Sequence, residues 1–149
     1  MSIAELAAFL KVFNQCLGNS SHLVLGGSLP PGITVSVYAE LIHMANRKGI
    51  VTVLDADGEA LAAGMRAVPY ALKPNIHELE QWCGHRLLTD EDVVSAGRKM
   101  INQGVSLLIV SMGERGSIAM NDKEAFRVTP FPIIPKKARL EPVTRWWQQ

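Results

Sequence analysis

The stretch Lys73-Pro74-Asn75-Ile76-His77-Glu78 joins a short apolar run to a segment with helical periodicity. Pro74 biases the residue before it towards an extended conformation, as at the end of a strand. Asn75 is a favoured N-cap residue and Glu78 stands three positions later, so their side chains can form a capping box on the first helical turn. The stretch therefore predicts a strand that ends near Lys73 and a helix that begins after Asn75.

Two interpretations of this stretch are open when it is taken alone. The first is a capping box that only closes an ordinary helix, which is the commoner use of such residues. The second is a polar cluster that holds a metal–phosphate complex, because the dipole and the free N–H groups of a helix N-terminus favour anions. The rest of the chain decides between the two.

The composition is that of an ordinary globular domain. The chain has 149 residues, 48% of them hydrophobic and 19% charged, and this length corresponds to about one domain. The net charge of +1 gives no general argument for binding to nucleic acid or to a membrane. Cys16 and Cys83 have neither metal-ligand nor disulfide spacing, and Glu5 interrupts the apolar start of the chain, which argues against a signal peptide. No apolar run approaches the ~20 residues of a membrane span, so we expect a cytoplasmic protein.

Strand-like and helix-like segments alternate along the chain. Four apolar runs are too short for helices and predict buried strands: residues 22–25, 50–54, 68–72 and 105–110. Amphipathic segments with helical spacing and end signals lie at residues 2–17, 34–48, 59–65, 76–83 and 89–103. Residues 117–120 and 125–128 flank a turn and predict a β-hairpin. We expect an α/β fold with a mostly parallel sheet, helices on both faces and a β-hairpin at the end.

Four polar or glycine-rich segments follow directly after the predicted strands. They are Gly26 to Gly32, Asp55 to Gly58, Lys73 to Glu78, and Ser111 to Gly116. Parallel strands all end at one edge of their sheet, and ligands bind in the crevice outside that edge. The four segments should therefore meet in space. Taken alone, the Gly26 loop could be only a turn, Asp55 could cap the following helix, and Ser111 to Gly116 could be a strand connection.

The residue types in these segments suit a phosphate ligand. The glycines of the first and last segments let backbone N–H groups approach an anion closely, and Lys73 can neutralise it. Hard oxygen donors of the kind that Mg²⁺ takes, usually through its waters, are present at Asp55, Asn75 and Glu78. Asp57 is assigned to a helix cap. The glycine spacing fits neither the Walker pattern nor the dinucleotide-binding pattern, which argues against those two nucleotide sites.

Three motifs, in this order and spacing, resemble the phosphofructokinase B group of ribokinase-like sugar kinases. They are Gly27-Ser28-Leu29-Pro30-Pro31-Gly32, Lys73-Pro74-Asn75 with Glu78-Leu79, and Val110-Ser111-Met112-Gly113 with Gly116. The run Glu78-Leu79-Glu80-Gln81-Trp82 followed by Gly84 is most similar to the bacterial 1-phosphofructokinase branch. Tagatose-6-phosphate kinase and the minor 6-phosphofructokinase remain as alternatives.

The resemblance implies ATP-dependent phosphorylation of a phosphosugar, from fructose 1-phosphate to fructose 1,6-bisphosphate, with Mg²⁺ as cofactor. It implies a place on the substrate-phosphate side for Gly27 and Ser28. It implies nucleotide contacts for Lys73, Asn75, Ser111, Gly113, Glu114 and Gly116. It implies Mg²⁺ binding, through water, for Asn75, Glu78 and Asp55.

The resemblance covers only the middle of such a kinase. We predict a partial ribokinase-like domain at residues 1–132 and an unrelated, disordered tail at residues 133–149, as a shifted reading frame would produce. The family's N-terminal substrate and lid elements are absent from the sequence. The Gly-Ala-Gly-Asp element is absent too, and with it the aspartate that acts as the base. We therefore predict no catalytic base and expect a truncated kinase without turnover.

A hypothesis of another class is a non-catalytic module that binds nucleotide or nucleic acid. The tail combines cations with tryptophans at Lys136, Lys137, Arg139, Arg145, Trp146 and Trp147. Charge together with base stacking can hold single-stranded nucleic acid. A disordered tail without a ligand is the alternative explanation of the same residues.

Overall fold

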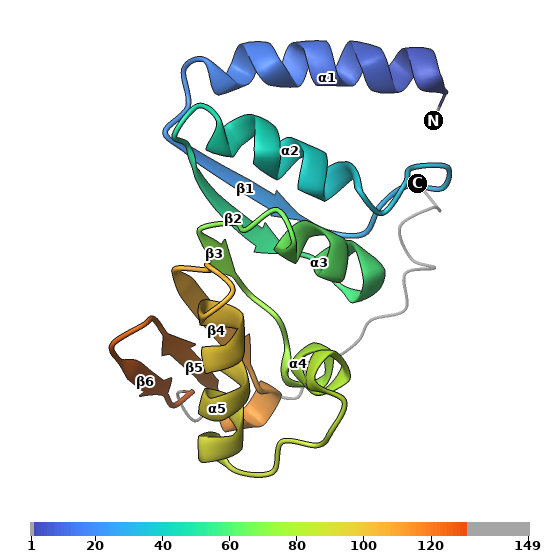
Figure 1. Cartoon of the computed structure of the whole chain (residues 1–149). Coiled ribbons are helices and arrows are strands. Elements are labelled where there is room, and N and C mark those ends of the chain that lie inside the picture. Colours follow the sequence, from blue (N-terminus) through green and yellow to red (C-terminus); the bar gives the residue numbers. More distant parts are fainter. Residues whose placement is uncertain (1, 131–149) are drawn as a thin grey trace, which may run out of the picture.

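The computed structural model describes residues 2–130 as an α/β fold with one sheet of six strands in the order β1-β2-β3-β4-β5-β6 (Figure 1). The strands are β1 (His22–Gly26), β2 (Val51–Asp55), β3 (Ala71–Leu72), β4 (Leu107–Ser111), β5 (Ser117–Met120) and β6 (Ala125–Val128). β1 to β4 are parallel, and β5 and β6 are antiparallel additions at one side. The predicted mostly parallel sheet that ends in a β-hairpin is confirmed.

Helices connect or precede the parallel strands, as the sequence spacing predicts. They are α1 (Ile3–Leu17), α2 (Val37–Asn46), α3 (Gly58–Met65), α4 (Ile76–Cys83) and α5 (Asp90–Ile101), with a 3-10 turn η1 (Gly113–Arg115). Capping boxes begin α1, α4 and α5, and they are formed by Ser2 with Glu5, Asn75 with Glu78, and Thr89 with Asp92. None of the helices between residues 2 and 130 has the length and apolar character that a membrane span requires.

The core lies on one face of the sheet. Strand register places five buried apolar side chains in one row across it: Leu25, Leu54, Leu72, Leu108 and Met120. Glycines let two helices approach this row closely. A Cβ on Gly64 of α3 would lie 2.5 Å from Leu54 Cδ2, and a Cβ on Gly97 of α5 would lie 2.5 Å from Met120 Sδ. α3 and α5 therefore cover the same face.

The helices that connect the parallel strands within residues 2–130 lie on one face of the sheet. From β1 to β4 the chain moves across the sheet in one direction, and right-handed crossovers in a constant direction place their helices on the same face. The opposite face leaves Val24 of β1 70% exposed and Phe126 of β6 58% exposed. Reversal of strand order, which a doubly wound sheet needs, does not occur among the described strands.

The third predicted strand is shorter than expected. Residues 68–72 read as an apolar run, but only Ala71–Leu72 pair as β3. Val68 has a φ of 52°, and its N–H donates to the carbonyl of Met65 at 2.9 Å. Val68 thus closes the turn after α3, so tertiary context overrides its preference for strands.

Candidate functional site at the carboxyl edge of the sheet

An ion pair joins the ends of β2 and β3. Asp55 is the last residue of β2, and Lys73 follows β3, where its N–H donates to the carbonyl of Leu54 at 3.0 Å. Lys73 Nζ lies 3.0 Å from Asp55 Oδ2, with the two side chains 43% and 47% exposed. The ammonium has three donors, so Lys73 can contact Asp55 and still meet an anion from solvent.

The capping box of α4 lies next to this ion pair in the sequence. Glu78 Oε2 accepts from the backbone N–H of Asn75 at 2.8 Å, and Asn75 Oδ1 accepts from the backbone N–H of Glu78 at 3.0 Å. The Asn75 side-chain amide also donates to Glu78 Oε1 at 2.6 Å. The cap interpretation is therefore confirmed. A carboxylate offers about four lone-pair positions, so Glu78 keeps acceptor capacity beyond these two contacts.

Backbone hydrogen bonds hold the four strand-end segments together. The N–H of Gly27 donates to the carbonyl of Asp55 at 3.2 Å. The N–H of Ser111 donates to the carbonyl of Pro74 at 3.0 Å, and Ser111 forms an isolated parallel bridge with Asn75. The convergence expected from a parallel sheet is found in the structure.

A groove of about 530 Å³ opens between the first turns of α3 and α4. Its walls are formed by Leu29, Val35, Asp57, Gly58, Glu59, Ala60, Asn75, His77, Glu78 and Gln81. Asp57 is the N-cap of α3 but makes no side-chain capping hydrogen bond, so it does not satisfy the first-turn N–H groups of that helix. Two helix N-termini thus border the groove, and their dipoles favour an anion there.

Several predicted residues lie outside this groove. Ser28 lines a separate apolar pocket of about 320 Å³, together with Phe9 and Leu41. Gly113, Glu114 and Gly116 belong to the turn that follows β4 and are not among the walls of either cavity. Asp55, Lys73 and Ser111 are not among the walls of the groove either. The structure therefore brings Asp55 to Lys73 and Asn75 to Glu78 by direct contact, and it does not bring all the predicted residues into one cavity.

Tyr38 of α2 has a structural role that the sequence did not signal. Its hydroxyl donates to the carbonyls of Gly27 at 2.8 Å and Gly26 at 3.2 Å, and so fixes the loop that carries Ser28. Burial raises the pKa of Tyr38, and the nearby carboxylate of Asp57 raises it further. The neutral phenol therefore keeps its donor role throughout the neutral range.

Three polar walls of the groove were not predicted as site residues. The sequence assigns Asp57 to a helix cap, gives Glu59 no role, and counts Gln81 only in the run that resembles the family, yet all three line the groove with Glu78. Their common signal is position in the first turns of α3 and α4 or one turn further along. That signal can be used only when the two helices are known to lie side by side.

The donor set fits a hydrated magnesium ion better than a metal bound only by protein. Among residues 2–130, no group of three or more His, Cys, Asp or Glu side chains is arranged to hold a metal ion. Asp55 is engaged by Lys73, and Glu78 by Asn75. Mg²⁺ commonly keeps several waters and meets only one or two carboxylates beside phosphate groups. The oxygens of Asp55, Asn75 and Glu78 suit such contacts through water.

The residues of the nucleic-acid hypothesis lie outside the described part of the chain. They are Lys136, Lys137, Arg139, Arg145, Trp146 and Trp147, all beyond residue 130. The predicted boundary at residue 132 and the predicted disordered tail lie there as well. These expectations stay predictions.

Comparison with solved structures gives the class of fold. Phosphofructokinase-2 from Escherichia coli, in complex with fructose-6-phosphate, superposes with a TM-score of 0.76 at 32% sequence identity. The match covers 84% of this chain and 43% of that one. The described fold is therefore that of a ribokinase-like sugar kinase domain, in part.

Sequence comparison then gives the family. The profile described as pfkB family carbohydrate kinase matches residues 3–136, so the chain belongs to the pfkB family of carbohydrate kinases. The 1-phosphofructokinase of Haemophilus influenzae is 35% identical over 115 residues, which cover 77% of this chain and 36% of the relative. That of Xanthomonas campestris is 41% identical over 100 residues, covering 64% and 31%. This chain spans about a third of the length of these relatives, and the predicted family resemblance is confirmed.

Proposed function

We propose that this chain binds MgATP at the carboxyl edge of its sheet, as the nucleotide and metal side of a 1-phosphofructokinase-type site. The reaction proposed for such a site is ATP-dependent phosphorylation of fructose 1-phosphate to fructose 1,6-bisphosphate, in the cytoplasm. Family membership and the names of the two relatives support it. The observation that carries it is the Lys73–Asp55 ion pair beside the Asn75–Glu78 capping box.

Each residue has a defined part in this proposal. Lys73 neutralises a phosphate of the nucleotide, and the first turn of α4 receives the anion through its N–H groups. Asn75, Glu78 and Asp55 hold a hydrated Mg²⁺, which when bound neutralises charge on the transferring phosphate. The loop after β4 lines the nucleotide through Ser111, Gly113, Glu114 and Gly116.

The acceptor side belongs to the loop after β1. Gly27 and Ser28 are proposed to face the phosphate of the sugar, in a loop that the hydroxyl of Tyr38 holds in place. Fructose 6-phosphate is the second candidate acceptor, because the matched phosphofructokinase-2 structure is a complex with that sugar. Tagatose 6-phosphate is the third.

Turnover also needs a group that accepts the proton of the attacking hydroxyl. The Gly-Ala-Gly-Asp element, which resemblance to the family implies as its source, does not occur in the 149-residue sequence. We therefore expect this chain to bind MgATP without phosphorylating fructose 1-phosphate. Clear ATP-dependent turnover of either fructose phosphate by the 149-residue chain would show that another residue serves as the base.

Binding can be tested by calorimetric titration of the chain with ATP, with and without Mg²⁺. We expect Mg²⁺-dependent binding that Lys73→Met weakens about tenfold, since one charge-assisted contact is lost. Lys99→Met is the matched control, because Lys99 is an exposed lysine on α5, away from the sheet edge. Absence of ATP binding, or equal losses in the two variants, would contradict the proposal.

A further inference from the structure

The turn after β4 has a defined backbone shape. The N–H of Met112 donates to the carbonyl of Gly116 at 2.8 Å, and the N–H of Gly116 donates to that of Gly113 at 2.9 Å. Gly113 and Gly116 have φ values of 60° and 83°, which glycine adopts without strain. This turn is where the chain leaves the parallel strands and enters the hairpin of β5 and β6.

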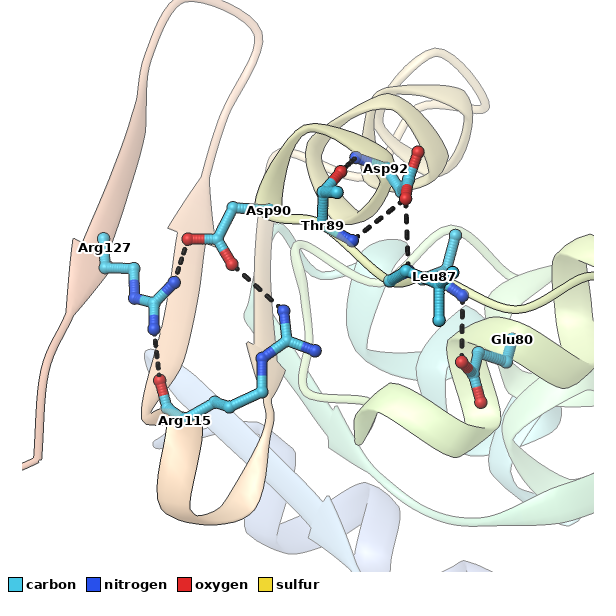
Figure 2. Close-up of polar contacts among 8 residues, drawn as sticks. Glu80, Leu87, Thr89, Asp90, Asp92, Arg115 and Arg127 are labelled. Carbon is cyan, nitrogen blue, oxygen red and sulfur yellow. Dashed lines mark hydrogen bonds and ion pairs between the residues drawn. The ribbon is translucent and has the colours of Figure 1, made fainter.

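Three charged residues from distant parts of the sequence meet at this turn (Figure 2). Asp90, the first residue of α5, uses one carboxylate oxygen for each of two arginines: Oδ1 lies 3.1 Å from Arg115 Nη2, and Oδ2 pairs with Arg127 Nη1. Arg127 Nη2 also donates to the backbone carbonyl of Arg115 at 2.9 Å. One guanidinium thus bridges a carboxylate on α5 and the backbone of η1.

A second contact fixes the other end of the same hairpin to α5. Arg98, two turns along the helix, donates to the carbonyls of Asn121 at 3.2 Å and Asp122 at 2.6 Å, in the turn between β5 and β6. The hairpin is therefore held at its turn by Arg98 and at its base by Asp90. Because both attachments come from one helix, α5 sets where the Met112–Gly116 turn lies.

We infer that Asp90, Arg115 and Arg127 form a clamp that positions the Met112–Gly116 turn for the nucleotide, an inference that rests on the nucleotide role proposed above for this turn. Asp90 is a positioning residue, since it contacts the turn only through the two arginines. Without its carboxylate two guanidinium groups would face each other unneutralised, and the turn would move away from α5.

The clamp is better suited to positioning than to global stability. Its three side chains are 35% to 42% exposed, and ion pairs so open to solvent contribute little to the folding free energy. The guanidinium of Arg127 nevertheless contacts the backbone carbonyl of Arg115 as well as the carboxylate of Asp90, so it restrains the backbone of the turn. We therefore expect loss of the clamp to change the local order of the turn and leave the melting temperature within about 2 °C.

Amide hydrogen exchange on the full chain, read by mass spectrometry or NMR, tests the clamp directly. In Asp90→Asn, the amides of Met112, Arg115 and Gly116 should exchange about tenfold faster. Glu91→Gln is the matched control, because it removes the same charge from the same helical turn and Glu91 is not part of the clamp. Unchanged exchange in Asp90→Asn, or equal acceleration in both variants, would overturn the clamp.

Two arginine variants separate positioning from charge. Arg127→Lys keeps the positive charge, but an ammonium is a point charge and cannot reproduce the planar bridge between carboxylate and carbonyl. We expect Arg127→Lys to accelerate exchange in the turn nearly as much as Arg127→Gln. Exchange at the rate of the unaltered chain in Arg127→Lys would mean that the bridge has no positioning role.

ATP titration completes the test. If the clamp serves the nucleotide, Asp90→Asn should weaken MgATP binding about fivefold to tenfold, Asp90→Glu should restore part of it, and Glu91→Gln should leave it unchanged. Faster exchange with unaltered ATP affinity would overturn the nucleotide part of the inference. If the unaltered chain binds no ATP, the proposed function fails, and with it the nucleotide part, while the exchange data still decide whether the clamp exists.

Discussion

Two helices of this molecule begin with the same local motif at different places in the fold. At α4, the Asn75 side chain accepts from the backbone N–H of Glu78 at 3.0 Å, and the Glu78 side chain accepts from the backbone N–H of Asn75 at 2.8 Å. At α5, Thr89 and Asp92 do the same at 3.1 and 3.0 Å (Figure 2). Their local chemistry is nearly identical, so any difference in function must come from their surroundings.

The two capping boxes differ in whether they lie close to the ends of strands. The α4 box follows the parallel strand β3, bridges to Ser111 at the end of β4 and borders the groove of about 530 Å³. The α5 box follows a loop that leaves α4, and the further contact of Asp92 is the backbone N–H of Leu88 at 3.1 Å. A capping box alone is thus no sign of a binding site. Its position at the carboxyl edge of the sheet is what makes the α4 box a candidate.

The largest expected difference between the two boxes is in MgATP binding. Glu78→Gln should lower the affinity about a hundredfold, because it removes the negative charge that we propose acts on the hydrated metal. Asp92→Asn, the equivalent change in the α5 box, should leave the affinity within about twofold. Calorimetric titration of both variants at fixed Mg²⁺ measures the contrast.

Glu78→Gln removes the negative charge but keeps an oxygen that can serve in the cap. The oxygen of glutamine can still accept the backbone N–H of Asn75, as in capping boxes that use Gln. Glutamine has only one side-chain oxygen, so the contact of Glu78 Oε1 with the Asn75 side-chain amide is lost as well. A loss of affinity in Glu78→Gln therefore reports the charge together with this contact, and not a frayed helix. If Glu78→Gln and Asp92→Asn lower the affinity for MgATP equally, the position of α4 at the sheet edge has no role in binding.

A smaller difference should separate stability from binding. Asn75→Ala and Thr89→Ala each remove an N-cap acceptor, and each should lower the free energy of unfolding by about 1 kcal/mol in urea titrations. Only Asn75→Ala should also weaken MgATP binding. Similar losses of stability, with weaker MgATP binding only in Asn75→Ala, would support a functional difference between the two boxes. Weaker MgATP binding in Thr89→Ala would contradict it.

Local signals were sufficient for much of this fold. Capping boxes, glycine stops and the hairpin turn depend on residues a few positions apart, so their patterns predict α1, α4, α5 and the β5–β6 hairpin directly from the sequence. The meeting of the segments that carry Asp55 and Lys73 followed from one further step, because parallel strands must end at one edge. The ion pair between the two side chains was found only in the structure.

The features that the sequence did not predict depend on contacts between residues that are far apart in the chain. Val68 fits a strand by type, but the turn after α3 imposes a positive φ. Asp57 and Glu59 reach the groove only because α3 lies beside α4. The clamp joins Asp90 to arginines that lie 25 and 37 positions away in the chain, where no spacing rule applies.

The smallest expected effect is the pH dependence of the α5 box. The backbone N–H of Thr89, followed by its hydroxyl, holds the pKa of Asp92 below its ordinary value. A carboxyl with a lowered folded-state pKa stabilises the fold above the unfolded-state pKa of about 3.9, and this contribution is lost as pH falls through the folded-state value. The difference in unfolding free energy between the unaltered chain and Asp92→Asn should therefore shrink on acidification below about pH 5 in urea titrations. Glu91→Gln controls for removing a carboxylate from this helical turn. A difference for Asp92→Asn that stays constant from neutral to acid pH would show that its carboxylate does not stabilise the cap.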